Sequence, residues 1–173
     1  MDTERRFAGF KKESPDPRIR EIPEGGFCMS AFLIIAKRGN PHQVLMGHLN
    51  REAQWDHIGA LFPEMVERCS KGWMLPSSQL IFGESPQQAA QRILKEQLGL
   101  QNLKLEESGV FSEVYGPLNH WDVEFLFSGE TDHAPTHSAW KELEFVDLTK
   151  TTKDQMTRFH EDILDHVGKW KAL

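Results

Sequence analysis

A loop followed by a capped helix, within residues 75–100, constrains the fold of this 173-residue chain more than any other segment. Ser85 is a suitable N-cap, and Pro86 then takes the first helical position, where its missing N–H costs nothing. Gln88 stands three residues after Ser85, as a capping box requires. Gly99 follows the last turn and suits the left-handed conformation that ends a helix. The sequence therefore predicts a helix that begins at Pro86 and ends just before Gly99.

The predicted helix carries a narrow apolar stripe and a polar flank. The stripe consists of residues at helical spacing, which indicates packing against a core; they are Ala90, Ile93 and Leu94. Arg92, Glu96 and Gln97 lie off this stripe, and Arg92 stands one helical turn before Glu96.

With its loop, this helix resembles the Nudix box, whose pattern is a glycine, five residues, a glutamate, seven residues and then R-E-U-x-E-E-x-G-U, with U an aliphatic residue. Six of the nine fixed positions match at the right spacing: Glu84, Arg92, Leu94, Glu96, Gly99 and Leu100. The departures are Ser78 for the first glycine, Ile93 for the first helical glutamate and Gln97 for the last. The resemblance implies an α/β fold, a Nudix-like α/β/α sandwich with a mixed β-sheet, over roughly residues 28–168.

The resemblance also implies a chemistry. Nudix enzymes hydrolyse a nucleoside diphosphate linked to another moiety, as in a nucleotide sugar, and use Mg²⁺ or Mn²⁺ held by the helix glutamates. Magnesium prefers carboxylate oxygens, and of the three glutamate positions only Glu96 keeps one. The candidate metal ligands are therefore Glu96, Glu84 and Gln97, with turnover weakened by the degenerate box. The alternative is a catalytically inactive Nudix-fold module that binds a ligand or regulates.

Structural roles compete with these functional ones. The resemblance implies that Glu84 and Arg92 pair and brace the loop against the helix, while Arg92 is also a candidate contact for the substrate. Glu96 suits a solvated helix surface as well as a metal site. We expect Ile93 in the core and Gln97 on the surface.

Four residues outside the box are candidate general bases. One Nudix subgroup, similar to GDP-mannose hydrolases, takes its base from a histidine in a later loop. His133 and His137 lie in such a turn-rich segment, and histidine titrates close to neutral pH. Glu113 and Glu124 lie on expected strands after the box. Glu124 alternates with Val123, Phe125 and Phe127, which predicts that its side chain points into the site and that the opposite face of the strand carries the core. For both histidines, a surface loop without function is the competing interpretation.

The remaining chain is predicted to form strands and a closing helix. The expected strands are 27–36, 43–49, 73–75, 103–114, 121–128 and 143–148, the first two forming a hairpin across a turn at 39–41. Thr152 is expected to cap a final helix, with the apolar stripe Met156, Phe159, Ile163, Val167 and Trp170. Residues 1–26 are expected to form an extended lead-in, and residues 27–173 a single domain.

An insertion at about 51–72 separates the second strand from the box and is predicted to contain a short helix with Pro63 in its first turn. Trp55, followed by Asp56 and His57, is a candidate lining of a substrate pocket. The preferred interpretation is that Trp55 packs the insertion onto the domain.

Charge and composition bound the partners. The chain has 26 acidic and 20 basic residues, a net charge of −6, which argues against a nucleic-acid backbone as partner. It has no apolar run near 18 residues, so we expect a cytoplasmic protein without a membrane segment. Cys28 and Cys69 lack metal-site spacing and are expected as free thiols, Cys28 in the core. The resemblance implies a nucleotide-type small molecule as ligand, and homodimerisation.

Overall fold

The computed structural model describes residues 27–58, 63–81, 83–115 and 120–169. The strands are β1 (Phe27–Lys37), β2 (Asn40–Leu49), β3 (Ser77–Gln79), β4 (Glu106–Tyr115), β5 (His120–Thr131) and β6 (Trp140–Asp147). The helices are α1 (Trp55–Ile58), α2 (Pro63–Cys69), α3 (Pro86–Leu98), the 3-10 turn η1 (Lys153–Gln155) and α4 (His160–His166). The lead-in predicted at 1–26 and the stripe residue Trp170 lie outside the described residues.

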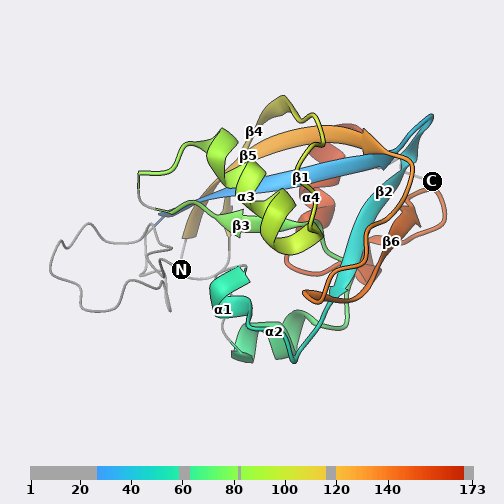
Figure 1. Cartoon of the computed structure of the whole chain (residues 1–173). Coiled ribbons are helices and arrows are strands. Elements are labelled where there is room, and N and C mark those ends of the chain that lie inside the picture. Colours follow the sequence, from blue (N-terminus) through green and yellow to red (C-terminus); the bar gives the residue numbers. More distant parts are fainter. Residues whose placement is uncertain (1–26, 59–62, 82, 116–119, 170–173) are drawn as a thin grey trace, which may run out of the picture.

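The strands form one mixed sheet in the order β4-β5-β1-β2-β6, with β3 also paired to β1 (Figure 1). β1 runs parallel to β5 and antiparallel to both β2 and β3. The central position of β1 explains its nearly continuous apolar sequence, because both faces of a central strand are covered. The predicted mixed sheet, α/β class and first hairpin are confirmed.

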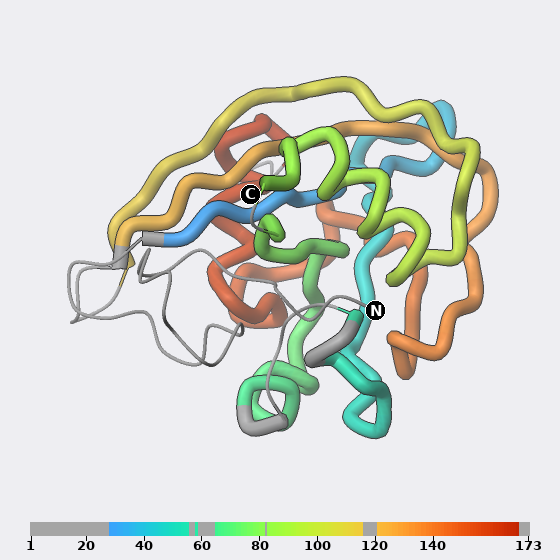
Figure 2. Tube along the Cα trace, turned by 60° about the vertical axis from the view of Figure 1, so that its left-hand side comes forward, coloured from blue at the N-terminus to red at the C-terminus, as the bar shows by residue number. Residues whose placement is uncertain are grey.

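Helices cover both faces of this sheet. Successive side chains of a strand point to opposite faces: Ala31 and Leu33 of β1 pack in one cluster with Ile93 of α3, and Phe32 packs in another with Ile163 of α4. We call these the α3 face and the α4 face. Figures 1 and 2 show β1, in blue, between α3, in green, and α4, in red. Ile93 is fully buried, as predicted.

The caps of α3 are the predicted ones. The backbone N–H of Gln88 donates to Ser85 Oγ at 3.2 Å, and the N–H of Ser85 donates to Gln88 Oε1 at 2.8 Å. At the other end Gly99 has a φ of 65° and closes the helix in the left-handed conformation. Local sequence therefore fixes both ends of this helix.

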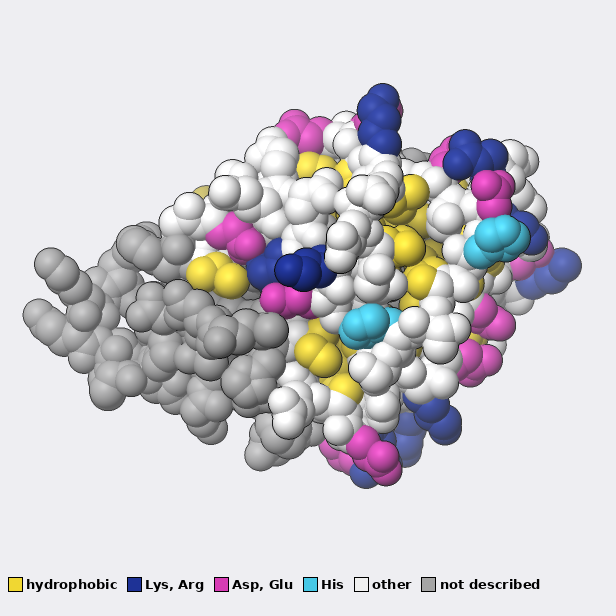
Figure 3. All heavy atoms as spheres, viewed as in Figure 1, with side chains coloured by type: hydrophobic (Ala, Val, Ile, Leu, Met, Phe, Trp, Pro, Cys, Tyr) yellow, Lys and Arg dark blue, Asp and Glu magenta, His cyan; other side chains and the backbone are white. Residues whose placement is uncertain are grey.

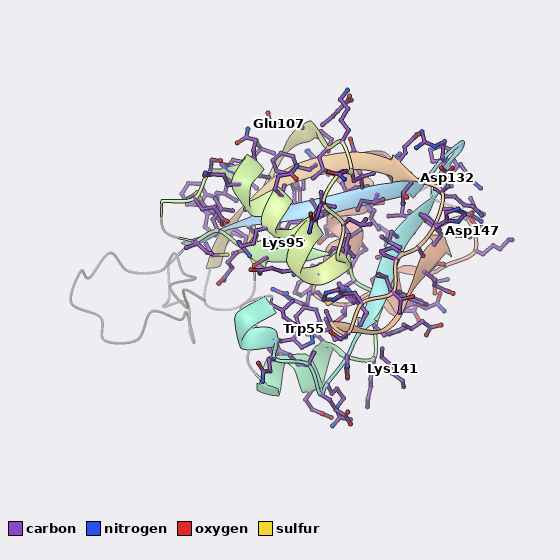
Figure 4. All side chains as sticks on the ribbon, in the orientation of Figure 1. Trp55, Lys95, Glu107, Asp132, Lys141 and Asp147 are labelled. Atoms are coloured by element: carbon purple, nitrogen blue, oxygen red, sulfur yellow. The ribbon has the colours of Figure 1, made fainter. Side chains whose placement is uncertain are left out.

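The insertion packs on the domain through Trp55, which is 2% exposed and labelled in Figure 4. Its indole N–H donates to the carbonyl of Asn50 at 2.8 Å. Its ring meets that of Trp140 edge-on, with centroids 5.4 Å apart. The packing interpretation is confirmed, because the ring is buried in a third core cluster with Leu49 and Met74. The side chains of Asp56 and His57 lie outside the described residues.

Two predictions about regular structure are corrected. Trp73 and Met74 form only isolated bridges, and the strand that enters the box is β3. Trp73 bridges Met156: the N–H of Trp73 donates to the carbonyl of Gln155 at 2.9 Å, and the N–H of Thr157 donates to the carbonyl of Trp73 at 3.0 Å. This pairing interrupts the predicted closing helix around Met156. The carbonyl of Gln155 and the N–H of Thr157 bond Trp73, so they are not available for hydrogen bonds within a helix.

The predicted closing helix is therefore split into η1 and α4. Between them Arg158 and Phe159 have φ values of 60° and 59°. Phe159 leaves the predicted apolar stripe and is 58% exposed. None of the helices in the described part of the chain is long and apolar enough to cross a bilayer.

Candidate functional site

A buried ion pair joins the loop of the box to its helix. Arg92 Nε donates to Glu84 Oε1 at 2.8 Å, and Arg92 Nη2 donates to Glu84 Oε2 at 2.9 Å. Glu84 Oε2 also accepts the backbone N–H of Ile81 at 2.9 Å. The two side chains are only 11% and 12% exposed. The bidentate geometry makes this a strong, oriented pair, and it is the brace that the resemblance implies.

Arg92 also holds β3 and the next turn of α3. Its Nη1 donates to Ser78 Oγ at 3.2 Å and its Nη2 to the carbonyl of Gln79 at 2.9 Å. Nη1 lies 3.6 Å from Glu96 Oε2. The Glu96 side chain is 16% exposed, so it is not the solvated surface carboxylate of the competing interpretation. One guanidinium therefore serves two carboxylates and fixes the strand beside them.

Gln97 is buried, and its predicted surface position is wrong. Its Oε1 accepts the backbone N–H of Ser77 at 3.2 Å, and its Nε2 donates to the carbonyl of Ser77 at 2.7 Å. The side chain thus pairs with both backbone groups of one residue of β3. The backbone carbonyl of Gln97 in turn accepts the indole N–H of Trp140 at 2.9 Å. Ser77 was not singled out from the sequence, because its partner lies twenty positions away on another element.

The residues at the box do not fit a Nudix metal centre. Hard divalent cations require several oxygen ligands, usually including carboxylates. Ile93 is in the core, and the amide of Gln97 is bonded to β3. Glu84 is bonded to Arg92 through both carboxylate oxygens, and Glu96 also lies 3.6 Å from the same guanidinium. Among the described residues, no group of three Asp, Glu, His or Cys side chains is placed to hold a metal ion.

The structure separates the two candidate histidines. His137 lies at the end of α3, where its Cδ2 would be 3.5 Å from a Cβ added to Gly99, and its Nδ1 accepts the N–H of Ala139 at 3.2 Å. His133 is exposed in the loop after β5. It follows Asp132, which pairs with Arg38 at 3.2 Å and is labelled at the far end of the sheet in Figure 4. Only His137 comes close to the box helix.

Glu113 and Glu124 lie on the α4 face. Glu124 is 6% exposed and points into the domain, but on the α4 face and not towards the box as expected, while Glu113 is exposed on β4. Leu126, two residues beyond Glu124 on β5, packs in the α4 cluster. Burial, followed by the charge of Asp122, raises the pKa of Glu124 to about 8. Both carboxylates therefore lie across the sheet from α3 and the box.

An open cleft of about 540 Å³ lies at the other end of β1 and β5. Its lining includes Arg38, Lys104, Glu106 and Lys169. Arg38 pairs with Asp132, and Lys104 with Glu106, so its charges are largely matched. On the face drawn in Figure 3, Lys and Arg side chains are likewise interspersed with Asp and Glu.

Comparison with known proteins shows which solved structures share this fold. No family model matches the chain, and no curated protein sequence matches it. Solved structures do match. The MutT protein of Methanosarcina mazei Go1 has a TM-score of 0.58 at 13% identity, over 83% of this chain and 94% of that chain.

Two further matches are similar in extent. The dihydroneopterin triphosphate pyrophosphohydrolase of E. coli gives a TM-score of 0.56 at 16% identity, over 80% of this chain and 94% of that one. The NUDIX domain of Shewanella oneidensis NrtR, solved with ADP ribose, gives 0.58 at 11% identity, over 82% and 86%. Since identities this low are informative about architecture and not about chemistry, the box-like capped helix and the matching sandwich together make this chain a Nudix-fold protein.

Proposed function

We propose that this chain is a ligand-binding module that uses the Nudix fold to hold a nucleotide-type small molecule without Nudix-type hydrolysis. The observation that supports this most directly is Gln97. At a position where the family pattern has a metal-binding glutamate, both polar atoms of its side chain bond the backbone of Ser77. The box then serves as a structural joint between α3 and β3.

Two further facts support this proposal. Ile93 occupies the position of the first helical glutamate and is fully buried, so the side chain at that position packs in the core. Solved relatives include one complexed with ADP ribose and one named for its action on dihydroneopterin triphosphate. A nucleotide-type ligand is therefore the natural class to test on this chain.

Metal-dependent hydrolysis of a nucleoside-diphosphate-linked compound is the second candidate function. The observation that favours it is Glu96, a carboxylate kept at its family position and held 3.6 Å from Arg92. His137, at the end of the same helix, is the best-placed of the proposed bases. Loss of a general base alone costs on the order of 10²–10⁴ in rate, so weak turnover is the form that this alternative takes.

One experiment separates the two. The protein is incubated with nucleotide sugars, ADP-ribose, dinucleoside polyphosphates and coenzyme A, with Mg²⁺ or Mn²⁺, and followed by phosphorus NMR and thermal denaturation. If the chain is a binding module, at least one compound should stabilise it against thermal denaturation and no product should form. The Glu96→Gln variant should then give the same result as the wild-type chain. Metal-dependent product that disappears in Glu96→Gln would establish the hydrolase. No stabilisation and no product with any compound would refute both.

A further inference from the structure

Strand β4 forms one edge of the sheet, and within the described residues no strand lies on its outer side. In Figure 2 it is the yellow tube that runs along the top, outside β5. Phe111 and Tyr115 are half-buried, and its other residues are exposed. A bulge between Glu107 and Gly109 leaves residues 110–115 as the regular part of the strand. Such an edge presents unpaired backbone N–H and C=O groups, which are a template for pairing with another strand.

The opposite edge of the sheet, β6, has the features that prevent such pairing. Lys141, Glu142 and Glu144 are exposed along this strand. Charged side chains, lysine above all, protect an edge strand from pairing with another chain. By contrast, residues 108–112 of β4 have the sequence SGVFS, without charge or proline. β4 is therefore the edge that is open to pairing.

An exposed apolar patch lies on the α3 face beside this edge. Val110 and Val114 of β4 and Trp121 of β5 are each about half exposed. Val110 pairs with Phe125, which packs against the α3 cluster, and Val114 pairs with Trp121, so the patch lies on one face. The indole N–H of Trp121 donates to Ser112 Oγ at 2.7 Å, which holds the ring against β4. We call Val110, Val114 and Trp121 the edge patch.

The side chains of β4 are self-complementary in one antiparallel register. A two-fold axis at Ser112 would place Val110 opposite Val114 of a second copy. It would also place Glu113 opposite Phe111 of the second copy, whereas an axis at Glu113 would set the two Glu113 carboxylates against each other. Apolar pairs directly opposite stabilise a sheet, and like charges directly opposite destabilise it. The side chains therefore favour the register centred on Ser112.

We infer that this chain associates with a second copy of itself through β4, in an antiparallel pair centred on Ser112 that joins the two sheets into one. The contact is isologous, because each copy presents the same strand and the same edge patch. Residues 110–114 of the two copies would form about four to six backbone hydrogen bonds. The two edge patches would meet across the axis and shield each other from water. Association of this kind does not depend on the proposed ligand.

Sedimentation velocity of the full chain over a range of concentrations tests the association. Because a strand-to-strand contact is smaller than a standard interface, the wild-type chain should change from monomer to dimer in the micromolar range. Val114→Lys places a charge in the edge patch and should weaken the dimer by about tenfold or more. The matched control is Thr136→Lys, which adds the same charge in the exposed loop before β6 and should leave the dimer unchanged.

Ser112→Cys tests the register without relying on an added charge. The Cα atoms of residue 112 in the two copies would lie about 4.5–5.5 Å apart, within the range for a disulfide. The native cysteines, Cys28 and Cys69, are buried. Mild oxidation should therefore link Ser112→Cys into a covalent dimer. Val110→Cys is the control, because the two copies of residue 110 would lie about 14 Å apart and should not be linked.

Three results would overturn the inference. A wild-type chain that stays monomeric at every concentration would exclude the association itself. Equal association of Val114→Lys and the wild-type chain would place the contact on another surface. Equal oxidation of Ser112→Cys and Val110→Cys to dimers, or of neither, would exclude the register.

Discussion

The two faces of the sheet beside β3 differ in whether their buried polar groups have hydrogen-bond partners. On the α3 face, Arg92 bonds Ser78 Oγ and both oxygens of Glu84, and Gln97 satisfies the backbone of Ser77. On the α4 face, Gln79 Oε1 and Glu124 Oε2 are buried and unpaired. A completed network stabilises and specifies a structure, whereas an incomplete one costs free energy. The contrast indicates that the network at the box stabilises the fold, while the unpaired atoms on the α4 face reduce its stability.

The largest expected effect is on the completed side. Arg92→Leu would leave two mostly buried carboxylates, Glu84 and Glu96, without their cation. Removing one partner of a buried pair costs about 3–5 kcal/mol, which urea denaturation measures. The matched control is Arg38→Leu, in a pair whose side chains are 60% exposed, with an expected loss of less than about 1 kcal/mol. Similar losses for the two variants would show that the box network is not structural.

The second effect concerns the α4 face, where the free energy of unfolding should depend on pH. Glu124 has a pKa raised from 4.5 to about 8. The native state therefore holds its proton more tightly than the unfolded chain does, and this contribution is fully present below about pH 4.5. It is lost as the pH rises towards 8 and changes little above that, a decline on the order of 4 kcal/mol between about pH 5 and about pH 9.

Glu124→Gln should remove that decline and make the protein more stable than wild type at about pH 8. Urea denaturation from about pH 5 to about pH 9 measures it, and Glu113→Gln is the control because that exposed carboxylate is the weakest of the charges that act on Glu124. Parallel pH profiles for wild type and Glu124→Gln would show that the carboxyl ionises normally and has partners in solution.

A third variant restores the family residue at the joint. Gln97→Glu would replace the amide that donates to the Ser77 carbonyl at 2.7 Å by a buried carboxylate. We expect a loss of about 2 kcal/mol, because a carboxylate cannot donate and must be protonated to remain there. Gln91→Glu, an exposed change of the same kind on α3, should be nearly neutral. Stability equal to wild type, with a gain on adding Mg²⁺, would reinstate the metal site.

The smallest effect is at the first box position. Ser78→Gly restores the family glycine, but Ser78 does not have the positive φ that favours glycine and its hydroxyl bonds Arg92 at 3.2 Å. The variant should lose about 1 kcal/mol, from one hydrogen bond and added chain entropy. A more stable variant would mean that the serine strains this loop.

Local sequence predicted much of the fold, because caps and periodicity are local. The ends of α3 are set by local residues, Ser85 and Gln88 at its start and Gly99 at its end, and a run of apolar residues predicts β1. The failures depend on distant partners. Gln97 looks like a surface residue until Ser77 is placed beside it, and the closing helix is broken because Met156 bridges Trp73. The unpaired side-chain atoms of Gln79 and Glu124 could not be predicted either, since an unpaired atom is defined by what surrounds it in space.

Gln79 belongs to both faces: its backbone carbonyl accepts from Arg92, and its side chain lies on the α4 face, in register with Ser30 of β1. Damage to the box would therefore also displace a side chain on the opposite face of the sheet. An Arg92 variant that no longer captures nucleotide would be compatible with a purely architectural arginine. Mutational scans of this protein should accordingly score folding and ligand capture separately before assigning any box residue to chemistry.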